Sequence, residues 1–169
     1  MFTRLRPSFS RLIIDQQGAY AVEFAILMPI LFLLLFGILD FGHYFYLRHL
    51  VVNASREGAR YATVYQTDAS GDRLLPNNLN PSIENYIINT SAENGGKGGV
   101  GLKTFLPSDA NPVITKSGAA SIETNPSVLA GEDLTITITA TKKWFLINNL
   151  VPSLGSEISL FCSTNMRCE

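Results

Sequence analysis

Two kinds of hydrophobic pattern divide this chain. Apolar residues are nearly continuous between residues 19 and 50, whereas the later sequence is rich in Thr, Ser, Asn and Gly. The stretch from Phe24 to Leu39 has 16 residues and carries no charge. As a helix it is about 24 Å long, and extension back to Ala19, which includes Glu23, brings it to about 31 Å. This length matches the ~30 Å hydrocarbon core of a bilayer, so the pattern predicts one membrane-spanning helix over residues 19–42.

The flanks of the apolar stretch support this interpretation. Aromatic side chains, which favour the membrane–water interface, lie at both edges: Tyr20, Phe41, Tyr44, Phe45 and Tyr46. A secretory signal peptide would need a small-residue cleavage site after the stretch, and the sequence D-F-G-H-Y that follows offers none. A buried core helix is the other alternative, but a segment that is apolar all round suits lipid better than a small domain.

The helical pattern continues past the membrane segment. Apolar and small residues recur at three- and four-residue spacing: Tyr44, Leu47, Val51, Ala54, Gly58 and Tyr61. We therefore expect one helix from Ala19 to about Tyr65, near 70 Å long, whose residues 43–65 form the spine of a domain. Pro29 lacks an amide donor and is expected to kink the helix inside the membrane.

Residues 66–169 predict a small α+β domain. Leu134 to Thr141 alternates strictly between apolar residues and Thr, which indicates a strand with one buried face. Ile158 to Ser163 is a second strand, and Val100–Phe105 and Val113–Thr115 are weaker candidates. Pro81 to Ile88 reads as a short helix capped by Ser82 or Asn80. The fold class expected is α+β, with a long N-terminal helix packed on a small antiparallel sheet.

Three further segments have simpler interpretations. Residues 66–81 are polar and predict a loop. The glycine-rich run 95–101 lacks the G-K-[ST] ending and the preceding strand of a phosphate loop, so a surface loop is expected. The pair Lys142-Lys143 is expected at a solvated strand end, and the apolar run Trp144–Pro152 is expected to be buried rather than to form an exposed contact surface.

Charge and candidate chemistry narrow the function. The formal net charge is −1, which disfavours nucleic acid as a partner because phosphate binding needs clustered basic residues. His43 and His49 point about 120° apart on a helix, and Asp40 could join only His43, so a metal site would lack a third ligand. No Ser, Cys or Lys stands in a recognisable nucleophile motif. We expect no cofactor, no metal and no enzymatic activity.

The residues just before the apolar run form a motif. Gln17 to Phe24 reads Q-G-A-Y-A-V-E-F, which resembles a type IV prepilin processing site. The resemblance implies that a prepilin peptidase cuts after Gly18, that Ala19 becomes the N-terminus, and that Glu23, then fifth, pairs with the terminal amine of a neighbouring subunit. Such a pair would relieve two charges that are unfavourable in lipid. The alternative is a Glu23 side chain that reaches the interface without a partner.

A longer resemblance covers residues 18–62. The stretch G-A-Y-A-V-E-F-A-I-L-M-P-I-L-F-L-L-L-F-G-I-L-D-F-G and the later A-S-R-E-G-A-R-Y-A are similar to the TadE-like family, minor pseudopilins of the tight-adherence (Flp) pilus system. Counting Arg residues on each side of the membrane segment leaves the orientation undecided: Arg4, Arg6 and Arg11 precede it, and Arg48, Arg56 and Arg60 follow it. The resemblance resolves the tie, because it implies a cytoplasmic leader 1–18 and an extracytoplasmic domain 66–169.

The expected function follows from this resemblance. It implies a non-catalytic assembly component in the bacterial inner membrane, with prepilin peptidase, other pilins and membrane platform proteins as partners. The alternatives are a membrane-anchored extracytoplasmic binding domain that is not processed, and an anchored hydrolase. Two cysteines, Cys162 and Cys168, could form a disulfide in an extracytoplasmic domain. They would lie about 20 Å apart in a straight strand, so pairing requires a turn at residues 163–165.

Overall fold

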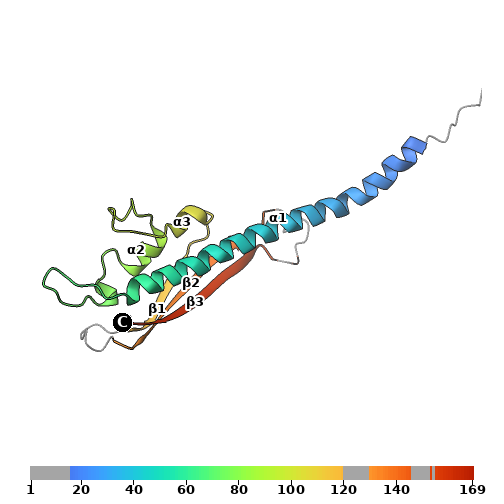
Figure 1. Cartoon of the computed structure of the whole chain (residues 1–169). Coiled ribbons are helices and arrows are strands. Elements are labelled where there is room, and N and C mark those ends of the chain that lie inside the picture. Colours follow the sequence, from blue (N-terminus) through green and yellow to red (C-terminus); the bar gives the residue numbers. More distant parts are fainter. Residues whose placement is uncertain (1–15, 120–129, 146–152, 154) are drawn as a thin grey trace, which may run out of the picture.

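The computed structural model describes residues 16–119, 130–145, 153 and 155–169. Its longest element is helix α1, Gln16–Thr63. A three-stranded antiparallel sheet follows, made of β1 (Val113–Gly118), β2 (Asp133–Lys143) and β3 (Glu157–Arg167). Figure 1 shows the N-terminal half of α1 projecting away from the other elements, while its C-terminal half lies along the sheet. The α+β fold class predicted from the sequence is confirmed.

Helix α1 has two parts with different surroundings. Between residues 18 and 39 nearly every side chain is exposed, whereas from Asp40 onward one face becomes buried. The predicted helix 19–65 is confirmed with small shifts at its ends, because α1 begins at Gln16 and ends at Thr63. The helix runs on through Pro29. A kink at this residue stays a prediction.

The sheet is built around β2, which pairs with β1 on one side and β3 on the other. Because strand side chains alternate between faces, its inner face is apolar and buried: Leu134, Ile136, Ile138, Ala140 and Leu160. The outer face carries the Thr residues of β2 and alternate residues of β3. Both strong strand predictions and the weaker one at Val113–Thr115 are confirmed, and each strand is longer than predicted.

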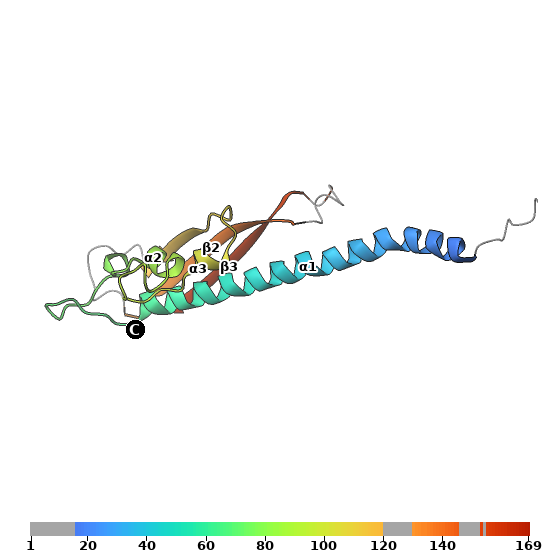
Figure 2. The ribbon, with the colours of Figure 1, turned by 90° about the horizontal axis from the view of Figure 1, so that it is seen from above.

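Small residues let α1 lie close to the other elements. A Cβ atom added at Gly58 would collide with the Ile87 side chain of helix α2. Ser55 donates one hydrogen bond to Thr164 Oγ1 of β3 at 2.7 Å and is 3.3 Å from the carbonyl oxygen of Ile136. Figure 2 shows the sheet beside the C-terminal half of α1 only, so the core of the fold lies between this half and the sheet.

Two short helices complete the core. Helix α2 (Ile83–Ile88) is capped by Ser82, whose Oγ accepts a hydrogen bond from the Asn85 amide at 3.2 Å, and this confirms one of the two predicted caps. Helix α3 (Leu102–Phe105) lies where the sequence suggested a strand, so that prediction is wrong. Gly101 precedes α3 with φ of 71°, a left-handed conformation that interrupts an extended chain.

The two other predicted loops, residues 66–81 and the glycine-rich run 95–101, are confirmed, and each contains short turns. Residues 66–81 contain the single 3-10 turn Pro76–Asn78, called η1. The glycine-rich run after Asn94 forms a turn in which the Asn94 side chain donates to the carbonyl oxygens of Asn85 at 3.2 Å and of Gly98 at 2.8 Å. This run therefore closes a loop by hydrogen bonds, as a surface connection does.

Candidate functional site

The residues predicted for processing and assembly lie in the first turns of α1. Gly18, Ala19 and Glu23 are all exposed. A Cβ atom added at Gly18 would meet nothing within 4 Å. The first amides of a helix have no intrahelical acceptor, so opening the chain at Gly18 disturbs few backbone hydrogen bonds and no tertiary packing.

Glu23 stands on an apolar surface. The large side chains around it are 57–66% exposed: Tyr20, Val22, Phe24, Ile26 and Leu27. Among the described residues, no ion pair or hydrogen bond is formed by the Glu23 carboxylate. An ionised side chain in a lipid-facing helix is unfavourable without a partner.

The exposed part of α1 has the properties of a membrane anchor. It is the one helix in the described residues that is long and apolar enough to span a bilayer, and none of its most apolar window is buried within the protein. A buried core helix, the alternative considered above, would lose this exposure. Membrane anchoring through one N-terminal helix is thus indicated by both sequence and structure.

A buried ion pair lies where the exposed and packed parts of α1 meet. Asp40 of α1 is 1% exposed and Lys142 of β2 is 0% exposed. The Lys142 Nζ atom is 3.7 Å from Asp40 Oδ1, and the same carboxylate oxygen accepts the backbone N–H of Phe145 at 3.1 Å. Burial lowers the pKa of Lys142, and the Asp40 carboxylate opposes this by favouring the charged ammonium. The pair joins the end of β2 to α1.

Aromatic rings surround this pair. Lys142 Nζ lies 4.7 Å from the ring centroid of Trp144 and 5.1 Å from that of Phe145, both within cation–π range. The Trp144 ring meets Phe41 edge-on at 5.4 Å, and Phe145 meets His43 at 5.0 Å. We call these five residues and Asp40 the junction cluster: Asp40, Phe41, His43, Lys142, Trp144 and Phe145.

Two predictions about this region are wrong in part, since Lys143 is exposed at the end of β2 as predicted but its neighbour is not. Lys142 is buried rather than solvated, and Phe145 is 61% exposed rather than buried. Trp144 is half-buried, and residues 146–152 of the predicted buried run lie outside the described residues. The signal for Lys142 was in the sequence: extending the alternation of β2 by one step places this residue on the inner face, where a charge needs a partner.

The junction cluster contains one histidine and one carboxylate. In the described ranges, no three metal-ligating side chains gather. Burial and the nearby Lys142 ammonium lower the pKa of His43, while Asp40 opposes the shift. His43 therefore favours the neutral form, which suits its packing against the ring of Phe145. His49, which is exposed, lies on another face of α1.

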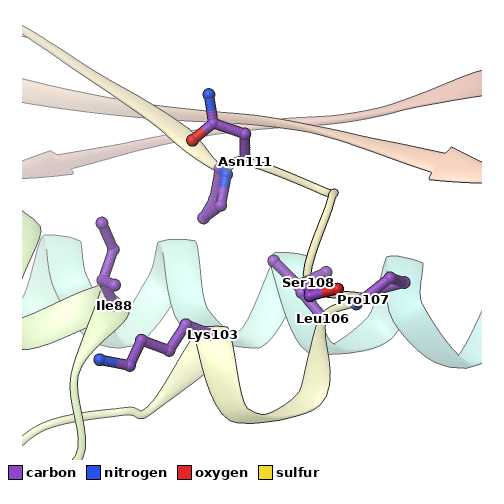
Figure 3. A pocket seen from close by; sticks show the side chains of 7 residues that line it. Ile88, Lys103, Leu106, Pro107, Ser108 and Asn111 are labelled. Carbon is purple, nitrogen blue, oxygen red and sulfur yellow. The ribbon is translucent and has the colours of Figure 1, made fainter.

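One pocket of about 360 Å³ lies away from the membrane helix. It is lined by Ile88, Lys103, Leu106, Pro107, Ser108, Asn111 and Pro112. Figure 3 shows Lys103 on α3 and Asn111 on the chain leading to the sheet, on opposite sides of this hollow. The Lys103 ammonium is held by Glu93 at 2.7 Å and by Asn89 Oδ1 at 3.3 Å. The one charged side chain of the lining is therefore already paired with a carboxylate.

The two cysteines are free thiols. The turn that an intramolecular disulfide requires is not formed, because residues 163–165 belong to the continuous strand β3. Cys162 faces the inner side of the sheet opposite Ile138, and Cys168 is buried just beyond the end of the strand. The extended backbone keeps the two sulfur atoms too far apart to pair.

Comparison with known protein families agrees with the N-terminal pattern. The family model described as TadE-like protein matches residues 18–60. This chain carries a TadE-like segment. The resemblance predicted from the sequence is therefore confirmed over α1, and the TadE-like segment indicates a protein associated with the Tad pilus. No curated protein and no solved structure matches the chain.

The match ends near the C-terminus of α1 and so includes Gly18, Glu23 and Asp40 but none of the sheet. The TadE-like segment thus contains the whole exposed anchor and most of the packed half of the helix.

Proposed function

We propose that this chain is a minor pseudopilin, a non-catalytic assembly component of a tight-adherence pilus or a related secretion machine. The observation that carries the proposal is Glu23, an acidic residue on an exposed apolar helix, five residues after a glycine at the start of the TadE-like segment. A prepilin peptidase would cut after Gly18 and free the amine of Ala19. The Glu23 carboxylate of one subunit would then pair with this amine on its neighbour.

The electrostatics of the helix support this pairing. Glu23 and a new N-terminal amine are both unfavourable in the apolar region when alone, and together they neutralise each other. An α-amine has a pKa near 7.7–8.0 and is largely charged at neutral pH. Because the pair can form only at one relative position of two helices, it also sets their axial register. The domain after residue 66 would face the periplasm, with the N-terminus in the cytoplasm.

Because the C-terminal half of α1 packs against the sheet, the domain would move together with the membrane-spanning half of the same helix. Helix and sheet share one core, and the buried pair of Asp40 and Lys142 joins them at the membrane-proximal end. A force or displacement applied to the membrane half is transmitted to the domain through a continuous helix. Inner-membrane platform proteins and other pilins are the partners that this arrangement would serve.

The experiment that tests the proposal is the intact mass of the membrane protein, expressed with and without an active prepilin peptidase. We expect loss of residues 1–18 only with the peptidase, and no loss in Gly18→Leu. Gly42→Leu is the matched control, since a Cβ atom at Gly42 also meets nothing within 4 Å. An uncut chain beside a control substrate that is cut would overturn the proposal and leave an anchored binding domain.

A further inference from the structure

The apolar surface of the membrane helix continues onto the end of the sheet. Phe41, Phe45, Tyr46 and Phe145 are 44–61% exposed. The first three follow the membrane segment on α1, whereas Phe145 follows β2 and is held beside α1 by its hydrogen bond to Asp40. Figure 1 shows β2 and β3 running beside α1 and ending near its middle.

We propose that Phe145 inserts into the membrane interface beside α1, with the half-buried Trp144 next to it at the same depth, so that the domain contacts the lipid surface through the end of its sheet as well as through its anchor. The partner is the boundary between headgroups and acyl chains of the bilayer that α1 spans. This proposal depends on α1 spanning a membrane, and it does not depend on cleavage after Gly18.

The depth of the two rings supports the proposal. Phe41 lies two residues beyond Leu39, the end of the uncharged stretch, which is about 3 Å along a helix axis. The Trp144 ring centroid is 5.4 Å from that of Phe41, and the Phe145 centroid is 5.0 Å from the His43 ring. The end of the sheet is therefore at the level of the aromatic belt on α1, where Trp and Tyr side chains are favoured.

The charge distribution of the junction cluster also suits a lipid interface. The Lys142 ammonium is fully buried, and the Asp40 carboxylate and two aromatic rings cover it. The neighbouring Lys143 is exposed and pairs with Asp109 at 2.8 Å, on the polar side of the strand. The aromatic side of the strand end consequently presents Phe145 rather than a charge toward the membrane.

Lipid is favoured over a protein partner because the exposed aromatic rings are continuous with the exposed helix surface of residues 18–39. When residues 18–39 of α1 lie in the hydrocarbon core, the exposed rings directly next to them lie at the membrane–water interface. A partner protein would have to cover Phe145 while leaving the membrane helix beside it in lipid.

The fluorescence of Trp144, the single tryptophan of the chain, tests this directly. The full chain is reconstituted into phosphatidylcholine–phosphatidylglycerol vesicles with acyl chains that are plain, brominated near the headgroup, or brominated near the chain end. We expect headgroup-proximal bromine to lower the emission by roughly half, as for a ring at the interface, and chain-end bromine to lower it less. Iodide in the water should quench weakly.

A variant of the same chain provides the matched control. In the double variant Trp144→Phe and Phe161→Trp, the tryptophan moves to the outer face of β3, where Phe161 is 63% exposed. Its emission should be quenched by iodide and should not respond to brominated lipid. Circular dichroism of both proteins confirms that the fold is retained.

Two results would overturn the proposal. If Trp144 emission is equal in plain and brominated vesicles and iodide quenches it strongly, the end of the sheet lies in water. If neither bromine nor iodide quenches it, protein covers the ring, either from this chain or from a second copy. In both cases the aromatic belt is confined to α1.

Discussion

Lys142 of β2 places its ammonium 3.7 Å from the carboxylate of Asp40 on α1, and both side chains are buried. The pair lies at the point where the membrane helix becomes the spine of the domain. A buried charge is tolerated only with a partner, and each of these two residues supplies the countercharge for the other.

Removing one charge of this pair should destabilise the domain strongly. In Asp40→Asn the side chain still has an acceptor for the Phe145 amide but leaves the Lys142 ammonium buried without a countercharge. Loss of one partner of a buried ion pair costs about 3–5 kcal/mol. The double variant Asp40→Leu and Lys142→Met should recover most of that loss. Thermal unfolding in detergent micelles, followed by circular dichroism, measures both. Equal destabilisation by the single and double variants would contradict the pairing.

Gly58 should tolerate no side chain, because a Cβ atom there collides with Ile87 of α2. We expect Gly58→Ala to destabilise the domain by about 1–3 kcal/mol through overpacking, although Ala is the better helix former. Gly42→Ala, on the same helix with open space around it, should not destabilise it. Adding Ile87→Val to Gly58→Ala should restore part of the stability, as chemical denaturation can show. Unchanged stability of Gly58→Ala would mean that α1 and α2 are further apart.

Glu23 should be needed for assembly but not for processing. In cells that contain the complete pilus system, Glu23→Gln should still lose residues 1–18, whereas photo-crosslinks from position 20 to neighbouring subunits should fall severalfold. The amide cannot neutralise an N-terminal amine. Glu57→Gln, an exposed change on the packed half of α1, is the control and should leave the crosslinks unchanged. Crosslinks that persist in Glu23→Gln would show that the carboxylate has no partner.

The loop beside α3 should respond to acid. The Lys103 ammonium and the Thr90 amide bind the Glu93 carboxylate and lower its pKa from 4.5 to about 2. Because the folded pKa is depressed, the contribution to stability is present above pH 4.5 and is lost as the pH falls toward 2. A carbon-detected NMR titration of Glu93 should give the low pKa, and Lys103→Ala should raise it. A Glu93 pKa near 4.5 in the unmodified protein would exclude the contact.

The two thiols should react at different rates. Cys162 is half-buried, whereas Cys168 is 5% exposed and burial raises its pKa. Because the thiolate is the reactive species, iodoacetamide at neutral pH should alkylate Cys162 first, and Cys168 should react fully only after unfolding. Mass spectrometry without reductant should find both sites alkylated in the unfolded chain. An unreactive pair under those conditions would reveal a disulfide that the extended strand β3 does not allow.

Local patterns in the sequence determined the main elements of this protein. Apolar residues without interruption predicted the exposed half of α1, and three- and four-residue spacing predicted its packed half. Strict alternation predicted β2 and β3. These patterns are reliable because the spacing of apolar residues reflects which face of a helix or strand is buried and which faces water or lipid. A short segment shows this spacing without reference to the rest of the chain. The resemblance to the TadE-like family rests on such a continuous segment as well.

Features that depend on contacts between distant segments were decided only by the tertiary structure. The alternation of β2 places Lys142 on the inner face, but no local pattern identifies Asp40 and the two aromatic rings that surround its ammonium there. Residues 102–105 became a helix because Gly101 adopts a left-handed conformation next to the turn of the preceding loop. The cysteines stay apart because the pairing of β3 with β2 holds residues 163–165 extended. In each case contacts between segments outweighed a weak local preference, since many such contacts act together when a core forms.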